Sequence, residues 1–233
     1  MPLFPVAAYY FVPLFSILAI IGIVYGALVS MVQTDLKRLI AFSSVAHMGF
    51  VMLGISTLTE FGINAALFGM VAHGLITGML FFLAGSVQHR YHTREMARLG
   101  GNQNLLPILG GMLAFTAMAS LGLPGLAGFW GEFMALLSSF NPLDGLSTGL
   151  FRGAMVAGAI GTVLTAGYML WMYQRVFFGE LSNEKNKDLP DLNLREQWTL
   201  IPLIVIAFWI GLYPKPFFER MAPTVDRVLE RVA

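Results

Sequence analysis

Apolar runs separated by short charged clusters dominate the chain from end to end. A helix needs roughly 20 residues to cross about 30 Å of hydrocarbon, so the length of each run indicates whether it can span a bilayer. Five runs are long enough, and a sixth becomes long enough with its flanking residues. The predicted spans cover residues 9–32, 39–59, 62–87, 105–140, 153–174 and 198–213. The pattern therefore predicts an all-α, polytopic membrane protein of about six transmembrane helices.

The fourth run, residues 105–140, is too long for one straight span, because as a single helix it would measure about 54 Å. Gly122, Pro124 and Gly125 interrupt it near its middle. Proline removes a backbone donor, and glycine weakens a helix. We expect two half-helices with an unwound joint at membrane depth, where irregular backbone is tolerated only inside protein or beside water. Broken helices of this kind mark ion sites in many transporters, and a kink that serves packing alone is the alternative.

The composition agrees with the apolar runs and excludes several classes of protein for this chain. Hydrophobic residues make up 57% of the 233 residues, only 12% are charged, and the mean hydropathy is +0.72. A soluble domain would carry about a quarter charged residues. The formal net charge of +1 offers no basic face for nucleic acid. The absence of cysteine excludes disulfides, cysteine-ligated iron–sulfur clusters and cysteine zinc sites.

Charges between the runs set the predicted orientation and domains. The loops after spans one, three and five carry Lys or Arg, whereas the alternate loops, 59–62 and 141–150, carry neither. The basic loops are therefore predicted to be cytoplasmic and the amino terminus outside.

The first run lacks the basic start of a signal peptide, so we expect it to be a span. We divide the chain into a five-span unit (1–178), a cytoplasmic linker (179–197) and a last span with an outer tail (198–233), whose spacing suits an interfacial helix.

Three titratable side chains fall near mid-depth on three successive spans. Glu132 follows Pro124 by eight residues and is the one acidic residue within any predicted span. An ionised carboxylate in hydrocarbon is costly, so such residues face a bundle interior or water. His47 and His73 lie in spans two and three, and imidazole titrates near neutrality. We predict that the three form a proton relay; a snorkelling glutamate and structural histidines are the alternative.

Further polar residues accompany the relay candidates. Ser43 and Ser44 lie one turn before His47 and on its face. Lys37, which opens the second span, would deliver protons or tune the field of the relay, and the alternative role is a cytoplasmic anchor. The sequence contains no Walker loop, GxGxxG or HExxH motif, and neither mid-membrane histidine has the small-residue surroundings that a porphyrin needs. We therefore predict no metal site and no cofactor-binding site.

Four motifs in order resemble the antiporter-like M-type subunit of proton-translocating NADH:quinone oxidoreductase, respiratory complex I. They are QTDLKRLIAFSSVAHMGF (33–50), MVAHGL (70–75), LPGLAGFWGEF (123–133) and YQRVFFG (173–179). The resemblance implies one five-helix antiporter-like repeat plus a final helix, equivalent to helices nine to fourteen of that family. It matches Glu132 to the carboxylate of the broken helix and His47 and His73 to relay histidines. Lys37 matches the basic residue that opens the helix of His47.

The same resemblance implies the outward half of a proton pathway in a complex I membrane arm. The chain would be a subunit of a translocase and carry no redox centre, so that NADH, FMN, iron–sulfur clusters and quinone would be held by partner subunits. We expect the other complex I membrane subunits and the lipid bilayer as partners, and a bacterial plasma membrane as the location.

The first repeat of the family, with its buried Glu–Lys pair and central lysine, has no counterpart in this sequence. We therefore expect either a fragment of a longer gene or a split subunit whose other half is a separate chain that supplies the missing helices. Three alternatives stay open at this point. They are a subunit of a multi-subunit cation/proton antiporter, a subunit of an energy-converting hydrogenase, and a non-conducting fragment.

Overall fold

The computed structural model describes residues 3–101, 105–179, 187 and 189–230. Within this part of the chain the regular secondary structure is helical. The elements are α1 (Pro5–Met31), α2 (Leu36–Ser56), α3 (Glu60–Tyr91), η1 (Met96–Arg98), α4 (Pro107–Ser120), α5 (Ala127–Phe140), α6 (Thr148–Phe177), α7 (Leu194–Leu212) and α8 (Lys215–Leu229). In the described residues, 5 helices (α1, α2, α3, α6 and α7) are long and apolar enough to cross a membrane. The predicted all-α, polytopic class is confirmed.

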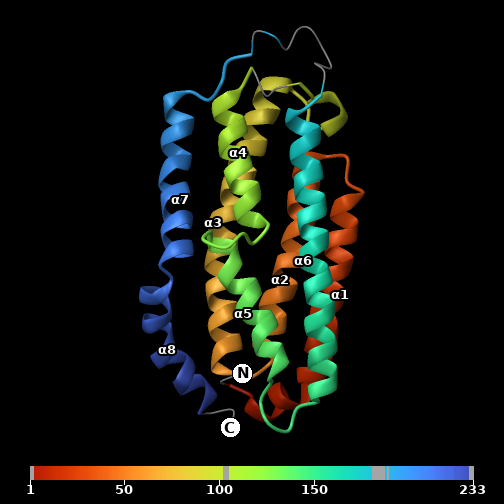
Figure 1. Cartoon of the computed structure of the whole chain (residues 1–233), viewed down its shortest axis with the longest axis vertical. Helices are drawn as coiled ribbons and strands as arrows, with labels where there is room; N and C mark the ends of the chain where they lie inside the picture. The colour runs from red at the N-terminus through yellow and green to blue at the C-terminus, as the bar shows by residue number, and fades with distance from the viewer. Residues whose placement is uncertain (1–2, 102–104, 180–186, 188, 231–233) are drawn as a thin grey trace.

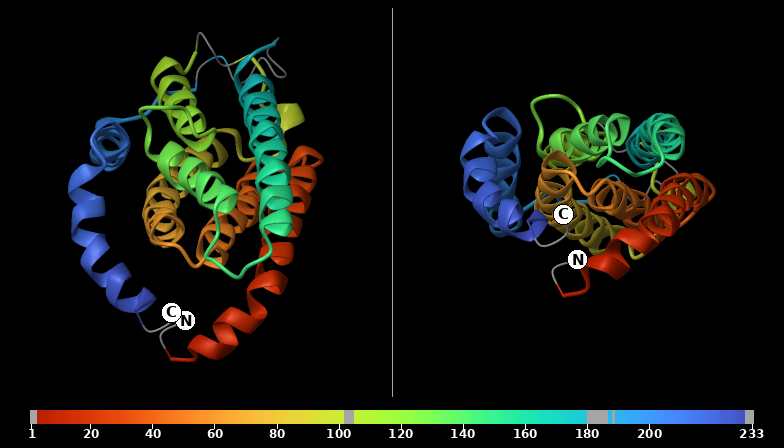
Figure 2. Two further views of the ribbon diagram at one scale, coloured as in Figure 1. Left: turned by 60° about the horizontal axis from the view of Figure 1, so that its bottom comes forward. Right: turned by 90° about the horizontal axis from the view of Figure 1, so that it is seen from below.

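The long helices run side by side along one axis (Figure 1). Helices α2 and α3 lie in the middle, with α1 and α6 on one side and α7 on the other, as the view from below also shows (Figure 2). The largest buried apolar cluster joins α2, α3, α4 and α6 through residues such as Ile40, Leu80, Leu113 and Met172. The core therefore sits around α2 and α3, which are the helices that carry the two candidate relay histidines.

The loops that the sequence assigned to opposite sides lie at opposite ends of the bundle. At one end, Arg94 Nε lies 3.1 Å from Asp35 Oδ2, which joins the segment after α3 to the turn between α1 and α2. At the other end, Leu143 N donates to Thr57 O at 3.0 Å, which joins the α5–α6 loop to the α2–α3 turn. The alternation along the sequence of loops with and without Lys or Arg thus corresponds to two distinct ends of the molecule.

The fourth run is a broken helix, as predicted. Helix α4 ends at Ser120 and α5 begins at Ala127, and residues 121–126 form the joint between them. Gly122 and Gly125 have φ values of +71° and +91°. Glycine adopts this left-handed region without the steric cost that a Cβ atom brings. Figure 1 places the joint about halfway along the bundle, between the two half-helices.

Helix α7 starts four residues before the predicted span at residue 198. Asn193 and Glu196 form a capping box, which fixes the start of α7 at Leu194. The predicted tail contains helix α8, and its Phe218 stacks on Phe68 of α3 with ring centroids 5.0 Å apart. Residues 180–186 and 188 of the predicted linker lie outside the described residues.

Candidate functional site

Glu132, His47 and His73 meet inside the bundle beside the joint. His47 Nδ1 lies 2.9 Å from Glu132 Oε1, and the two side chains are only 9% and 10% exposed. The ring centroids of His47 and His73 are 5.1 Å apart. The structure therefore brings together the three side chains that the sequence singled out, from α5, α2 and α3.

Each histidine also has a hydroxyl neighbour. Ser120 Oγ lies 3.2 Å from His47 Nε2, and Thr77 Oγ1 lies 3.0 Å from His73 Nε2. The tautomer of each ring decides which atom donates. Because Ser120 is the last residue of α4, both half-helices of the broken span contribute to the cluster. Both ring nitrogens of His47 thus face a polar partner.

A cavity of about 30 Å³ adjoins the cluster. Its lining includes His47, His73, Ser120 and Glu132, together with apolar and small residues of α2 to α5. This volume is enough for about one or two water molecules. Glu132 Oε2 is buried and accepts no hydrogen bond from the described residues. A water-sized space beside a carboxylate and two imidazoles can serve proton exchange between them.

Glycines let the backbones of α3 and α5 and the joint approach closely around the carboxylate. A Cβ atom at Gly131 would lie 2.7 Å from Gly69 Cα, and one at Gly122 would lie 3.0 Å from Glu132 Oε2. Real Cβ atoms essentially never make contacts as short as the first, so the α3–α5 crossing depends on glycine. The second contact shows that Glu132 Oε2 faces the backbone of the joint.

Lys37 does not join the cluster. It lies in the first turn of α2, ten residues before His47, which corresponds to about 15 Å along the helix axis. Its side chain is half-buried, and it does not line the cavity. Its role in feeding or tuning the relay stays a prediction.

The hydroxyl partner of His47 differs from the residues that the sequence suggested. Ser43 and Ser44 donate to the carbonyl oxygen of Ile40, at 2.7 and 3.4 Å, and not to the imidazole. Ser120, which sequence reasoning missed, takes that place from α4. Its position four residues before Pro124, at the end of the first half-helix, was the signal available, because half-helix ends point into such sites.

An all-α bundle with a helix broken at mid-depth, and a buried carboxylate–imidazole pair beside the break, has the architecture of an antiporter-like membrane subunit. The comparison with family models agrees. Residues 1–165 match the model described as NADH:quinone oxidoreductase/Mrp antiporter, transmembrane region. The chain belongs to this family, and the resemblance inferred from its motifs is confirmed.

Curated relatives match nearly the whole chain. NADH-quinone oxidoreductase subunit M of Rhodobacter capsulatus is 40% identical over 230 residues, which are 99% of this chain and 43% of that protein. NADH-ubiquinone oxidoreductase chain 4 of Chondrus crispus is 35% identical over 233 residues, 100% of this chain and 46% of that protein. The chain thus spans less than half the length of these relatives, which is consistent with its resemblance to one part of the M-type subunit.

Solved structures share the fold. A chain of respiratory complex I from Thermus thermophilus with bound NADH superposes with a TM-score of 0.86 and 28% identity, over 97% of this chain and 46% of that one. A chain of the Mrp complex from Dietzia sp. superposes with a TM-score of 0.80 at 17% identity, over 97% of this chain and 50% of that one. The second likeness concerns the fold alone.

Proposed function

We propose that this chain is a membrane-arm subunit of proton-translocating NADH:quinone oxidoreductase and provides the outward half of a proton pathway. Relatives that are 35–40% identical over nearly the whole chain carry the name of that enzyme. The observation that carries the proposal is the buried contact of 2.9 Å between His47 Nδ1 and Glu132 Oε1 beside the helix break. A carboxylate and an imidazole in contact can share one proton. Burial of ionisable groups in a membrane protein is costly, and such groups usually serve a function.

In this proposal a proton passes from His73 to His47 and then to Glu132. An imidazole can accept a proton at one ring nitrogen and release it from the other. His47 is placed for this, because Nδ1 faces Glu132 Oε1 at 2.9 Å and Nε2 faces Ser120 Oγ at 3.2 Å. The step from His73 needs one bridging water or a ring rotation, and the cavity that both histidines line is water-sized.

Coupling to the redox reaction is proposed to be electrostatic. Moving the proton between Nδ1 and Oε1 converts a neutral pair into an ion pair, so a change in nearby charge shifts the balance between the two states. The chain is proposed to carry no redox centre of its own. NADH, FMN, iron–sulfur clusters and quinone are assigned to partner subunits.

We propose a bacterial plasma membrane, with the basic loops in the cytoplasm and the α2–α3 turn outside. The basic residues at the end of α3 and after it support this orientation, because Arg90, Arg94 and Arg98 lie at the end of the bundle opposite the α5–α6 loop. Residues 1–178 form the antiporter-like repeat in this scheme, and the last span follows the linker. The missing first repeat comes either from the rest of a longer chain or from a separate subunit.

Replacing Glu132 by glutamine tests the proposal. Glutamine keeps the size of the side chain and a hydrogen-bonding group toward His47, but it cannot exchange a carboxyl proton. In vesicles that contain the intact complex, we expect proton pumping per NADH oxidised to fall about tenfold or more, while the complex still assembles. Vesicle acidification and NADH oxidation would be measured together.

Glu219→Gln is the matched control, because the Glu219 side chain is 65% exposed on α8. It should pump as the unmodified complex does. Normal pumping in the Glu132→Gln complex would rule out the carboxylate as a carrier. Normal pumping by an assembled Glu132→Gln complex would also favour the alternative in which this chain conducts no protons.

A cation/proton antiporter is the second candidate, because the family model itself includes Mrp antiporters. The two candidates differ in what drives proton movement. Proton movement driven by a sodium gradient in the absence of NADH would favour the antiporter. Pumping that requires NADH oxidation would favour the oxidoreductase.

A further inference from the structure

Helix α7 contacts the broken helix at its joint. Trp130 Nε1 donates to Gly211 O in the last turn of α7, at 2.7 Å. A Cβ atom at Gly211 would lie 2.5 Å from Gly125 O and from Leu126 Cα, so the backbone of α7 abuts the joint directly. Trp130 precedes Glu132 by two residues, in the first turn of α5. The hydrogen bond therefore ties α7 to the turn of α5 that leads into the carboxylate.

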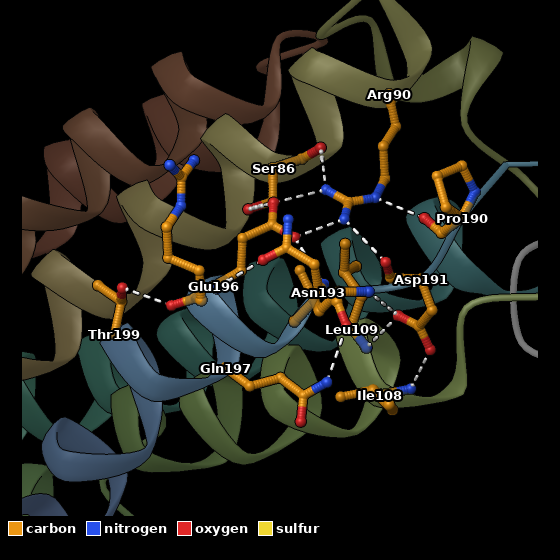
Figure 3. A network of polar contacts seen from close by, with 12 residues as sticks. Ser86, Arg90, Ile108, Leu109, Pro190, Asp191, Asn193, Glu196, Gln197 and Thr199 are labelled. Carbon is orange, nitrogen blue, oxygen red and sulfur yellow. Dashed lines mark hydrogen bonds and ion pairs between the residues drawn. The ribbon is translucent and has the colours of Figure 1, made fainter.

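The other end of α7 is anchored to α3 (Figure 3). Arg90 Nη1 and Nη2 donate to Glu196 Oε1 and Oε2 at 2.9 and 2.7 Å. The same guanidinium donates to the carbonyl oxygens of Asp191, at 3.0 Å, and Pro190, at 2.7 Å. Its side chain is only 6% exposed. A bidentate arginine–carboxylate pair of this kind is geometrically specific and strong, so it fixes the position of the start of α7.

Asp191 extends this anchor to the first half-helix. Its carboxylate accepts hydrogen bonds from Ile108 N at 2.7 Å and Leu109 N at 3.0 Å. These amides lie in the first turn of α4, where backbone donors have no partner within the helix and a negative charge is favoured. The segment before α7 thus holds the start of α4, and the end of α7 holds the joint that follows α4.

We infer that α7 braces the broken helix and that Trp130 is a positioning residue for Glu132. The segment that leads into α7 fixes the beginning of α4, at Asp191, and the last turn of α7 fixes the end of the joint, at Gly211. The glycines of the joint resist rotation of α5 only weakly, because the backbone of glycine can adopt many conformations. The bond from Trp130 to α7 supplies the missing restraint and keeps Glu132 within reach of His47. This inference rests on the proposed function, since that function gives the geometry of Glu132 its importance.

Trp130→Phe in the intact complex tests the brace. Phenylalanine keeps an aromatic ring but removes the donor to Gly211. We expect pumping per NADH to fall about fivefold, the change in population that the loss of one ordinary hydrogen bond produces. The infrared band of the Glu132 carboxyl, identified by its absence in Glu132→Gln, should shift. Gly211→Ala should shift the same band, because its Cβ would push α7 off the joint.

Trp209→Phe is the matched control, because Trp209 lies on α7 two residues before Gly211, is 52% exposed and contacts Phe217 of α8 with its ring. It should leave both the band and the pumping unchanged. An unchanged band and unchanged pumping in Trp130→Phe, while Glu132→Gln abolishes pumping, would overturn the brace and leave the proposed function standing. Normal pumping in Glu132→Gln would overturn the proposed function instead, and the infrared shift would still report on the brace. If Gly211→Ala fails to assemble, Trp130→Phe decides alone.

Discussion

At the scale of single residues, Glu132 is made tolerable in the bilayer by its surroundings. One carboxylate oxygen contacts His47 Nδ1 at 2.9 Å, and the residue also lines the water-sized cavity. Burying an ion pair removes both charges from water, and this desolvation has an unfavourable free energy. The contact between the two groups offsets that free energy only in part. The neutral and ionised forms of the pair share the same hydrogen bond and differ in the position of one proton. A proton can therefore move between the two groups with little change in geometry.

Ser120→Ala tests the polar partner on the other side of His47. It leaves His47 Nε2 without the hydroxyl at 3.2 Å, so we expect pumping per NADH to fall about fivefold, at a stability cost of about 1 kcal/mol. Ser139→Ala is the control, because Ser139 is also fully buried but donates to Ala135 O at 2.8 Å, away from the cluster. It should cost similar stability without loss of pumping. An equal loss of pumping in both variants would show that stability, and not the site, is affected.

At the scale of elements, the break determines which residues can meet. In an uninterrupted helix, Ser120 and Glu132 would lie about 18 Å apart along the axis. In the structure both contact His47, because residues 121–126 fold the chain so that the end of α4 and the second turn of α5 lie together. The joint therefore assembles the site, and it does more than relieve the excess length of the fourth run.

Gly122→Ala tests the joint. A residue with a Cβ atom in the left-handed region costs about 1–2 kcal/mol, and here the Cβ would also lie 3.0 Å from Glu132 Oε2. We expect a lower thermal unfolding midpoint in detergent and reduced pumping. Gly111→Ala in α4 is the control, since a Cβ there meets nothing within 4 Å; it should be neutral or stabilise by up to about 1 kcal/mol. Identical behaviour of the two variants would show that the glycine conformation of the joint is dispensable.

At the scale of the whole molecule, apolar side chains cover the outside of the bundle. Tyr10, Val163 and Trp198 are 77%, 70% and 69% exposed. Such surfaces are suited to lipid or to neighbouring membrane subunits. The polar network around Arg90 differs from this apolar exterior. Its hydrogen bonds connect α3, α4 and α7, which are far apart in the sequence (Figure 3).

Arg90→Met tests the contribution of this network to stability. The change leaves Glu196 without its bidentate partner. We therefore expect the free energy of unfolding to fall by about 3 kcal/mol, as for other largely buried ion pairs that lose one partner. The unfolding midpoint in detergent would be measured. In the control, Lys215→Met removes an exposed contact, 3.7 Å long, with Glu219, which should be worth less than about 1 kcal/mol. Similar losses for both variants would contradict a special role for Arg90.

The sequence alone determined the class of fold, the broken fourth span and the three side chains of the candidate relay. The physical reason is that a bilayer requires each spanning segment to satisfy its own backbone hydrogen bonds, so length and hydropathy reveal helices directly. The break was visible because proline and glycine act locally. Glu132 was visible because a carboxylate in an apolar run is rare.

Only the tertiary structure decided the partners: Ser120 in place of Ser43 and Ser44, and the bond from Trp130 to Gly211. These depend on how each helix is rotated about its axis. In a membrane the face toward lipid is as apolar as the face toward the core, so periodicity does not reveal that rotation. The close approaches at glycines, which set the final geometry, exist only once the helices have packed together.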